Sequence, residues 1–255
     1  MNSNFKWVGG IFLSVLCIFF DIIIATNINH NYDKRASIYR LALKTTNKDK
    51  FNYIVDSQQG NVITNAKLTA VSPVQFREMK SNQKFFAVKR TLEEYTMHTK
   101  TTTDSKGRTT TTTYWTWEDQ ETDYKYAKQF EMFGRKYKLA KFDISSYFDH
   151  IDAKKIVDGD NGLAGYYHYL DSDTRYSYEV VPTTITGTFI AQAVNNTLKP
   201  VKGHSNIKVT HEKYKEYLVD KQSKHRLVTI VVIIVLLLIE AWLIINIVIN
   251  WQLED

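Results

Sequence analysis

Val88 to Asp119 read VKRTLEEYTMHTKTTTDSKGRTTTTTYWTWED, and this stretch decides how the chain folds. Two runs rich in Thr, Tyr and Trp flank Asp104 to Gly107, a turn sequence with glycine at the position that favours a positive φ. Nine of the fifteen residues from Thr99 to Thr113 are threonine, whose β-branched side chain favours strand. The stretch predicts a long hairpin with a solvated tip. A glycosylated or ligand-binding threonine array is the alternative.

Further strands are expected on both sides of this hairpin. Asn61 to Val74 alternates between apolar and polar residues, and so does Tyr176 to Val194, which is broken by Pro182 and Gly187. Period-two alternation is typical of a strand with one buried face. The region between the two ends of the chain is therefore predicted to be β-rich.

Helical patterns are fewer. Asp33 to Asn47 predicts a short helix, and Ser145 to Val157 places apolar residues near one face behind a serine cap. A last helix is expected from Thr210, a good N-cap residue with Glu212 in the first turn. Strands and helices together predict an α+β domain.

Two apolar segments bracket this domain. Trp7 to Thr26 and Leu227 to Asn250 are the stretches long and apolar enough to cross roughly 30 Å of hydrocarbon as helix. The first lacks a small-x-small cleavage site, so it is interpreted as a signal anchor. The predicted organisation is a tail (1–6), a transmembrane helix (7–26), a β-rich domain ending in a basic juxtamembrane helix (27–226), a second transmembrane helix (227–250) and a tail (251–255). The fold class is a membrane-anchored α+β protein with a long Thr-rich hairpin.

Composition excludes several classes of protein. Only 10 Gly and 3 Pro rule out collagen-like and low-complexity chains, and the single cysteine, Cys17, rules out an intrachain disulfide or a CxxC pair. No phosphate-binding, zinc-protease or serine-hydrolase motif is present. Asp149, Asp152, Asp158 and Asp160 could gather around calcium, but turn and capping roles fit them better. We therefore predict no cofactor, no resident metal and no enzyme activity.

Acidic residues inside the apolar segments need an explanation, because a carboxyl group in hydrocarbon is costly unless it is paired, protonated or in contact with water. Asp21 lies about 8 Å, and Glu240 about 20 Å, from the domain-side end of its segment at roughly 1.5 Å per residue. A direct pair between them is therefore not expected. Glu240, with Asn246 and Asn250, is predicted to mediate helix association with another protomer or a partner helix. A proton or ion role and a tolerated protonated carboxyl are the alternatives.

A basic run precedes the second apolar segment. Its cations nearest the membrane are Lys213, Lys215, Lys221, Lys224 and Arg226. Such residues attract anionic headgroups by around 1 kcal/mol each, which predicts contact with a membrane surface. A solvated helix face is the alternative, and no known nucleic-acid reader motif is present.

Two signals disagree about which side of the membrane carries the domain. The run before the second segment, with Lys34, Arg35 and Arg40 after the first, places it in the cytoplasm by the positive-inside rule. Long domains, however, can cross regardless of flanking charge, and the basic amino end followed by an apolar run is typical of an export signal. Near absence of cysteine and a single Asn-x-Thr sequon indicate a bacterial cell membrane, with the domain extracytoplasmic.

The hairpin also carries a family resemblance. Arg90 to Tyr95 (RTLEEY), the Asp104 to Gly107 turn and Thr113 to Trp117 (TYWTW) resemble the hairpin of the LUMA family, transmembrane proteins of the nuclear envelope and endoplasmic reticulum with bacterial relatives. Lys141 to Lys154 is similar to the family segment that follows, and Thr188 to Pro200 keeps the same order before a membrane span. The likeness covers about 160 residues.

This chain also departs from the family pattern. Gln129 to Lys138 reads QFEMFGRKYK where the family has a Gly-His-x-Asn-Pro type signature, and one terminal span replaces several. The resemblance implies an N-terminal anchor, an extracytoplasmic or luminal β-rich domain and scaffolding through membrane partners, without enzyme activity. The expected function is a non-enzymatic membrane scaffold that binds lipids, other membrane proteins or itself, and no nucleic acid. The alternative is an accessory subunit of a transporter or ion pathway that uses Asp21 and Glu240.

Overall fold

The chain forms two compact units in the computed structural model, which describes residues 3–218, 230–242 and 245. A helical unit comprises residues 1–42 and 214–255, and a β-rich unit comprises residues 43–213. The β-rich unit is built mainly from antiparallel pairs. The predicted β-rich α+β fold is therefore confirmed.

The first sheet is centred on two long antiparallel strands, β2 (Gly60–Ala70) and β12 (Thr184–Val194). The short strands beside them are β1 (Leu43–Lys44), β5 (Gln129–Met132), β6 (Arg135–Lys138) and β13 (Thr197–Lys199), in the order β13–β12–β2–β5–β6 with β1 parallel to β2. Helix α2 (Lys48–Asp56) begins at Asn47, whose side chain accepts a hydrogen bond from the Lys50 backbone amide. It buries Phe51, Ile54 and Val55 in the core of this sheet.

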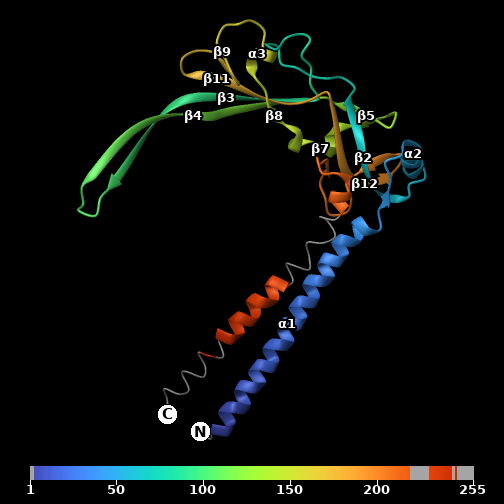
Figure 1. The fold of residues 1–255 in the computed structure, drawn as a ribbon, viewed down its shortest axis with the longest axis vertical. Helices are drawn as coiled ribbons and strands as arrows, with labels where there is room; N and C mark the ends of the chain where they lie inside the picture. The colour runs from blue at the N-terminus through green and yellow to red at the C-terminus, as the bar shows by residue number, and fades with distance from the viewer. Residues whose placement is uncertain (1–2, 219–229, 243–244, 246–255) are drawn as a thin grey trace. The chain divides into compact units, whose positions relative to one another are not determined.

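The second sheet contains the predicted hairpin. Its strands are β3 (Ala87–Thr103), β4 (Thr109–Tyr126), β8 (Asp149–His150), β9 (Leu163–Ala164), β10 (Tyr167–Tyr169) and β11 (Thr174–Val181), in the order β4–β3–β11–β10–β9 with β8 on β11. β3 and β4 continue together well beyond the end of β11 (Figure 1). Gly107 has φ +79°, as the turn sequence predicted. The Asp104 carboxylate accepts hydrogen bonds from the Lys106 and Arg108 backbone amides.

The segment between the sheets differs from its prediction. Ser145 to Val157 does not form one helix; it contains a 3₁₀ turn η2 (Ser145–Tyr147), strand β8 and helix α3 (Ala153–Ile156). The apolar residues are accommodated separately: Ile156 is buried, Phe148 packs against the main core and Ile151 against a second apolar cluster. Tyr147 is also buried, and its hydroxyl donates to the Thr186 carbonyl. Asp152 is the N-cap of α3, accepting the Lys154 amide, which confirms a capping role.

The helix boundaries predicted at the two ends of the β-rich unit also differ from those in the structure. Thr210 does not cap a helix but bridges Thr188 in β12, and helical residues resume only at Tyr214. The helix expected over Asp33 to Asn47 ends at Arg40 instead, and β1 follows it. In the same part of the unit, β7 (Phe142–Asp143), which follows the 3₁₀ turn η1 (Leu139–Lys141), pairs in parallel with β14 (Ile207–Lys208).

A chain of aromatic rings fills the main core. Phe86, Phe130, Phe142 and Phe189 contact one another in sequence, with ring centroids 4.8 to 6.1 Å apart. Gly187 faces the same region, where an added Cβ would lie 2.2 Å from the Tyr147 hydroxyl. This position in β12 therefore requires glycine because of close packing, and not because of its backbone angles.

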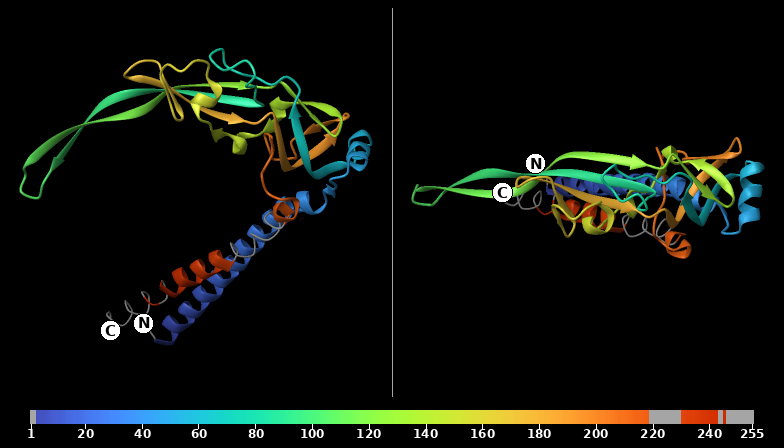
Figure 2. Two further views of the ribbon diagram at one scale, coloured as in Figure 1. Left: turned by 45° about the horizontal axis from the view of Figure 1, so that its top comes forward. Right: turned by 90° about the horizontal axis from the view of Figure 1, so that it is seen from above.

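The helical unit contains α1 (Ser3–Arg40) and the helical residues 230–242. These two helices lie side by side in Figures 1 and 2. Tyr39 and Tyr217 contact each other edge to face, with ring centroids 6.2 Å apart. Within the part of the chain that the structure describes, no helix has both the length and the apolarity needed to cross a membrane.

Candidate functional site

The free part of the β3–β4 hairpin is the most unusual surface of the β-rich unit, and we call it the ribbon (residues 95–117). β11 pairs with β3 only as far as Glu94, so the strands of the ribbon pair with each other alone among the described residues. A two-stranded ribbon needs side-chain contacts to hold its shape. Thr101 and Thr111 supply one such contact, and Thr103 and Thr109 another, with hydroxyl oxygens 3.2 and 3.3 Å apart.

One face of the ribbon carries a continuous row of rings. Residues directly opposite on antiparallel strands share a face, as Tyr95 and Trp117 do, and as Met97 and Trp115 do. The row continues across β3, β11 and β10, because Glu93 pairs with Arg175 and Arg175 with Tyr169. We call this row the aromatic ladder; its members are Tyr95, Met97, Trp115, Trp117, Tyr167, Tyr169 and Arg175.

Arg175 holds the inner end of the aromatic ladder. Its guanidinium lies 4.0 Å from the Trp117 ring centroid and 3.5 Å from that of Tyr167, in cation–π geometry. The Nε and Nη2 groups contact Oε2 of Glu93 at 2.8 and 2.6 Å, and Nη1 donates to the Tyr169 hydroxyl at 3.2 Å. Burial lowers the pKa of Arg175, but the bonds to Tyr169 and Glu93 outweigh it, so that the pKa is raised. The guanidinium therefore stays charged between the rings.

The outer end of the ladder is open to solvent. Tyr95 stacks on Trp115 with ring centroids 5.4 Å apart and also contacts Trp117 at 5.2 Å. Despite these contacts Tyr95 is 39% exposed, Trp115 52% and Met97 54%, whereas Arg175 is 8% exposed. The ladder thus runs from a buried ion pair to exposed rings whose positions are fixed by stacking.

A second stacked arginine supports the hairpin from the other face of β3. Arg90 lies between the rings of Phe76 and Tyr176, at 4.3 and 4.4 Å from their centroids. Its guanidinium donates to Glu78 at 2.9 Å and to Asp123. Arg90 is part of the stretch that carries the family resemblance, and here it ties β3 to β4 and to the loop before β3.

The two intramembrane acids predicted from the sequence occupy the helical unit and meet there. The side chains of Asp21 and Glu240 lie close enough to interact electrostatically, so the expectation that they stay apart is wrong. That expectation counted depth from Thr26 as the end of the first span, but α1 continues unbroken to Arg40. Tyr39 lies beside Tyr217, and Asp21 lies near Glu240, so the two helices run antiparallel.

The other predicted site residues fall into two groups. Lys213 and Lys215 are exposed, as contact with a membrane surface requires. The remaining predicted positions lie outside the described residues: Lys221, Lys224, Arg226, Asn246 and Asn250.

Sequence reasoning missed Arg175, the residue that organises the ladder. It lies outside the hairpin, and only the β11 register brings it opposite Glu93. The available signal was the alternation of Trp115 and Trp117 on the return strand opposite Tyr95, which places three rings on one face. A buried partner for those rings was not deducible without the pairing of β3 with β11.

Comparison with known proteins finds no family model, no curated protein and no solved structure that matches this chain.

Proposed function

We propose that this chain is a non-enzymatic integral membrane scaffold of the LUMA-like type, anchored by 7–26 and 227–250 in a bacterial cell membrane. Its β-rich domain organises lipids and partner proteins at one membrane face, which we assign to the extracytoplasmic side. Lipid contact is the task of the basic run that includes Lys213 and Lys215. Partner proteins dock on the outer end of the aromatic ladder.

One observation carries this proposal: Tyr95, Met97 and Trp115 are exposed together at the end of a row that is fixed at its base by Arg175. Tyr, Trp and Met are enriched in the centres of protein interfaces, and Trp and Tyr dominate binding hot spots. Large apolar side chains gathered on a soluble surface indicate an interaction site. Stacked rings also lose little freedom on binding, which favours affinity.

The test is site-specific photocrosslinking of the full chain in its native membrane. A photoreactive phenylalanine replaces Trp115 in one variant and Thr116 in another; Thr116 is the adjacent residue on the opposite face of β4 and is also exposed. We expect one recurrent protein adduct from position 115 and none from position 116. Equal adduct formation at both positions, or no adduct at 115, would refute docking on the ladder.

A matched substitution separates docking from folding. Trp115→Ala should remove the adduct formed by a photoreactive group at Met97, while Thr116→Ala should leave it unchanged. Thr116→Ala should change the free energy of unfolding by less than about 0.5 kcal/mol, as is usual for a surface substitution. Trp115→Ala should cost about 0.5 to 1.5 kcal/mol, because it removes the stacking on Tyr95, and should leave the protein folded.

The Asp21–Glu240 contact favours a second candidate, an accessory subunit of a transporter or ion pathway. Carboxyl groups within membrane segments occur in proton relays, and Oδ2 of Asp21 is buried without a hydrogen-bond partner within the described structure. Neutralising both, as Asp21→Asn with Glu240→Gln, should then abolish a transport phenotype without changing the amount of protein in the membrane. A drop in abundance with transport per molecule unchanged would instead assign the pair to helix packing.

A further inference from the structure

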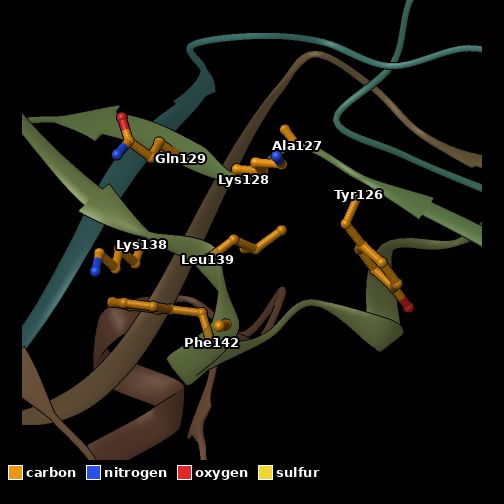
Figure 3. Close-up of a pocket in the computed structure, with 8 residues that line it drawn as sticks. Tyr126, Ala127, Lys128, Gln129, Lys138, Leu139 and Phe142 are labelled. Carbon is orange, nitrogen blue, oxygen red and sulfur yellow. The ribbon is translucent and has the colours of Figure 1, made fainter.

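A half-open pocket lies in the β-rich unit where the hairpin meets the first sheet. Its volume is about 550 Å³, within the range of about 300 to 1,000 Å³ that is usual for small-molecule sites. The lining residues come from the end of β4, the start of β5, the end of β6 and the segment leading into β7 (Figure 3). The backbone amide of Leu139 donates to the Lys128 carbonyl, which holds the two sides of the pocket together.

The inner wall of the pocket is apolar and rigid. Ala127, Leu139 and Phe142 line it, and all three are buried in the unit. The Phe142 ring packs edge to face against Phe130, with centroids 4.8 Å apart, so this wall is part of the aromatic core. A wall fixed in this way keeps the pocket from collapsing when it is empty.

The polar groups around the pocket share one property: their side chains can donate hydrogen bonds. They are Tyr126, Lys128, Gln129 and Lys138, and none of the described residues that line the pocket carries a carboxylate. Neither Lys128 nor Lys138 forms an ion pair among the described residues, and both are exposed. In Figure 3 the Lys138 side chain lies beside Phe142, whereas the Lys128 side chain lies beside Ala127.

We propose that this pocket binds a single-chain amphiphile with an anionic head, a long-chain carboxylate, with its chain on the Leu139 and Phe142 wall and its head at Lys128 and Lys138. Charge complementarity selects the head, because the charged side chains among the described residues that line the pocket are the two lysines. The pocket volume favours a ligand with one chain. If each carbon group of an acyl chain takes roughly 30 Å³, the volume of a water molecule, about 18 carbon groups fit in the pocket, which suits one acyl chain and not the two of a phospholipid.

The experiment uses the full chain in nonionic detergent and a long-chain fatty acid that carries a diazirine and an alkyne. After irradiation, labelled peptides are identified by mass spectrometry. We expect the label within residues 126–142. The long-chain alcohol with the same diazirine should label at least about fivefold less, because it lacks the charge that the lysines recognise.

Two variants test the chemistry of the site. Lys128→Gln with Lys138→Gln should lower labelling by about five- to tenfold, while the control Lys67→Gln with Lys136→Gln, two exposed lysines outside the pocket, should leave it unchanged. Ala140→Trp should block labelling by filling the pocket; Ala140 is exposed, so the core is not disturbed. An unchanged urea midpoint confirms that each variant is folded.

Three labelling results would overturn the proposal. They are label outside residues 126–142, equal labelling by the alcohol and the carboxylate, and labelling that survives Ala140→Trp in a folded protein. Displacement of the probe by vesicles of a two-chain anionic phospholipid at lower concentration than by free fatty acid would also overturn it, because the proposal commits to a single chain.

Discussion

Replacing Arg175 by methionine should destabilise the β-rich unit by about 3 to 5 kcal/mol. The side chains of Arg175 and Glu93 are 9% and 11% exposed, and they meet through contacts of 2.6 and 2.8 Å. Removing one partner of a buried ion pair leaves the other charge uncompensated, which costs an amount of this size. Methionine keeps an apolar stem against Trp117 and Tyr167, so the loss reports chiefly on the charge and its cation–π contacts.

The measurement is urea unfolding of the full chain in nonionic detergent, followed by tryptophan fluorescence. With a slope of about 2 kcal/mol per molar urea, the expected loss moves the midpoint down by about 2 M at unchanged slope. The double variant Arg175→Met with Glu93→Met should recover part of the loss, because it removes both charges, and a double-mutant cycle isolates their coupling. A single variant within about 0.5 kcal/mol of the parent would refute the reasoning, and so would a double variant whose loss equals the sum of the two singles.

Three further predictions concern packing, pH and topology. Gly187→Ala should cost about 1 to 3 kcal/mol in urea unfolding, since its methyl group would overlap the Tyr147 hydroxyl; no measurable change would show that β12 can shift. Burial raises the pKa of Tyr137 and of Tyr147 to about 12, above the unfolded value near 10. Their contribution to stability is therefore complete below pH 10 and is lost as the pH rises through 12. Ultraviolet titration should show these two phenols ionising late, and ionisation of all sixteen tyrosines near pH 10 would contradict this. With Cys17→Ser and Ser105→Cys, a membrane-impermeant maleimide should label intact cells at the hairpin tip, whereas labelling only after lysis would place the domain in the cytoplasm.

Local sequence patterns predicted the elements whose partners are close in the chain. The hairpin and its Gly107 turn follow from β-branched residues on both sides of a turn sequence, and β11 and β12 separate at Pro182 as expected. The second predicted break, at Gly187, is wrong, because β12 continues through Gly187 and pairs it with Ala66. The prediction of one helix over Ser145 to Val157 is wrong because the apolar spacing there suits a helix as well as the observed structure. Only the pairing of β8 with β11 decides against a helix. The break before Tyr214 is also tertiary in origin, since Thr210 hydrogen-bonds with Thr188.

The candidate sites were less predictable than the fold. Arg175 belongs to the ladder because β11 pairs with β3, and these two strands are far apart in the sequence. The proximity of Asp21 and Glu240 was missed because the depth of each acid was counted from the end of its apolar run, whereas α1 continues fourteen residues beyond Thr26 to Arg40. Hydropathy indicates whether a segment prefers water or an apolar environment, but it does not fix where a helix ends, because polar residues can also continue a helix.

The pairing of β2 with β12 fixes the order in which the β-rich unit can form during synthesis. β3 and β4 are neighbours in sequence and can pair as soon as Tyr126 has left the ribosome. β2 emerges earlier, but its long antiparallel partner is one of the last strands made. Until then Val62, Ile63 and Leu68 lack the strand beside them, so the nascent chain carries a finished hairpin next to an unfinished sheet. A chain that stops before Thr184 is therefore expected to expose β2 and to aggregate through that strand.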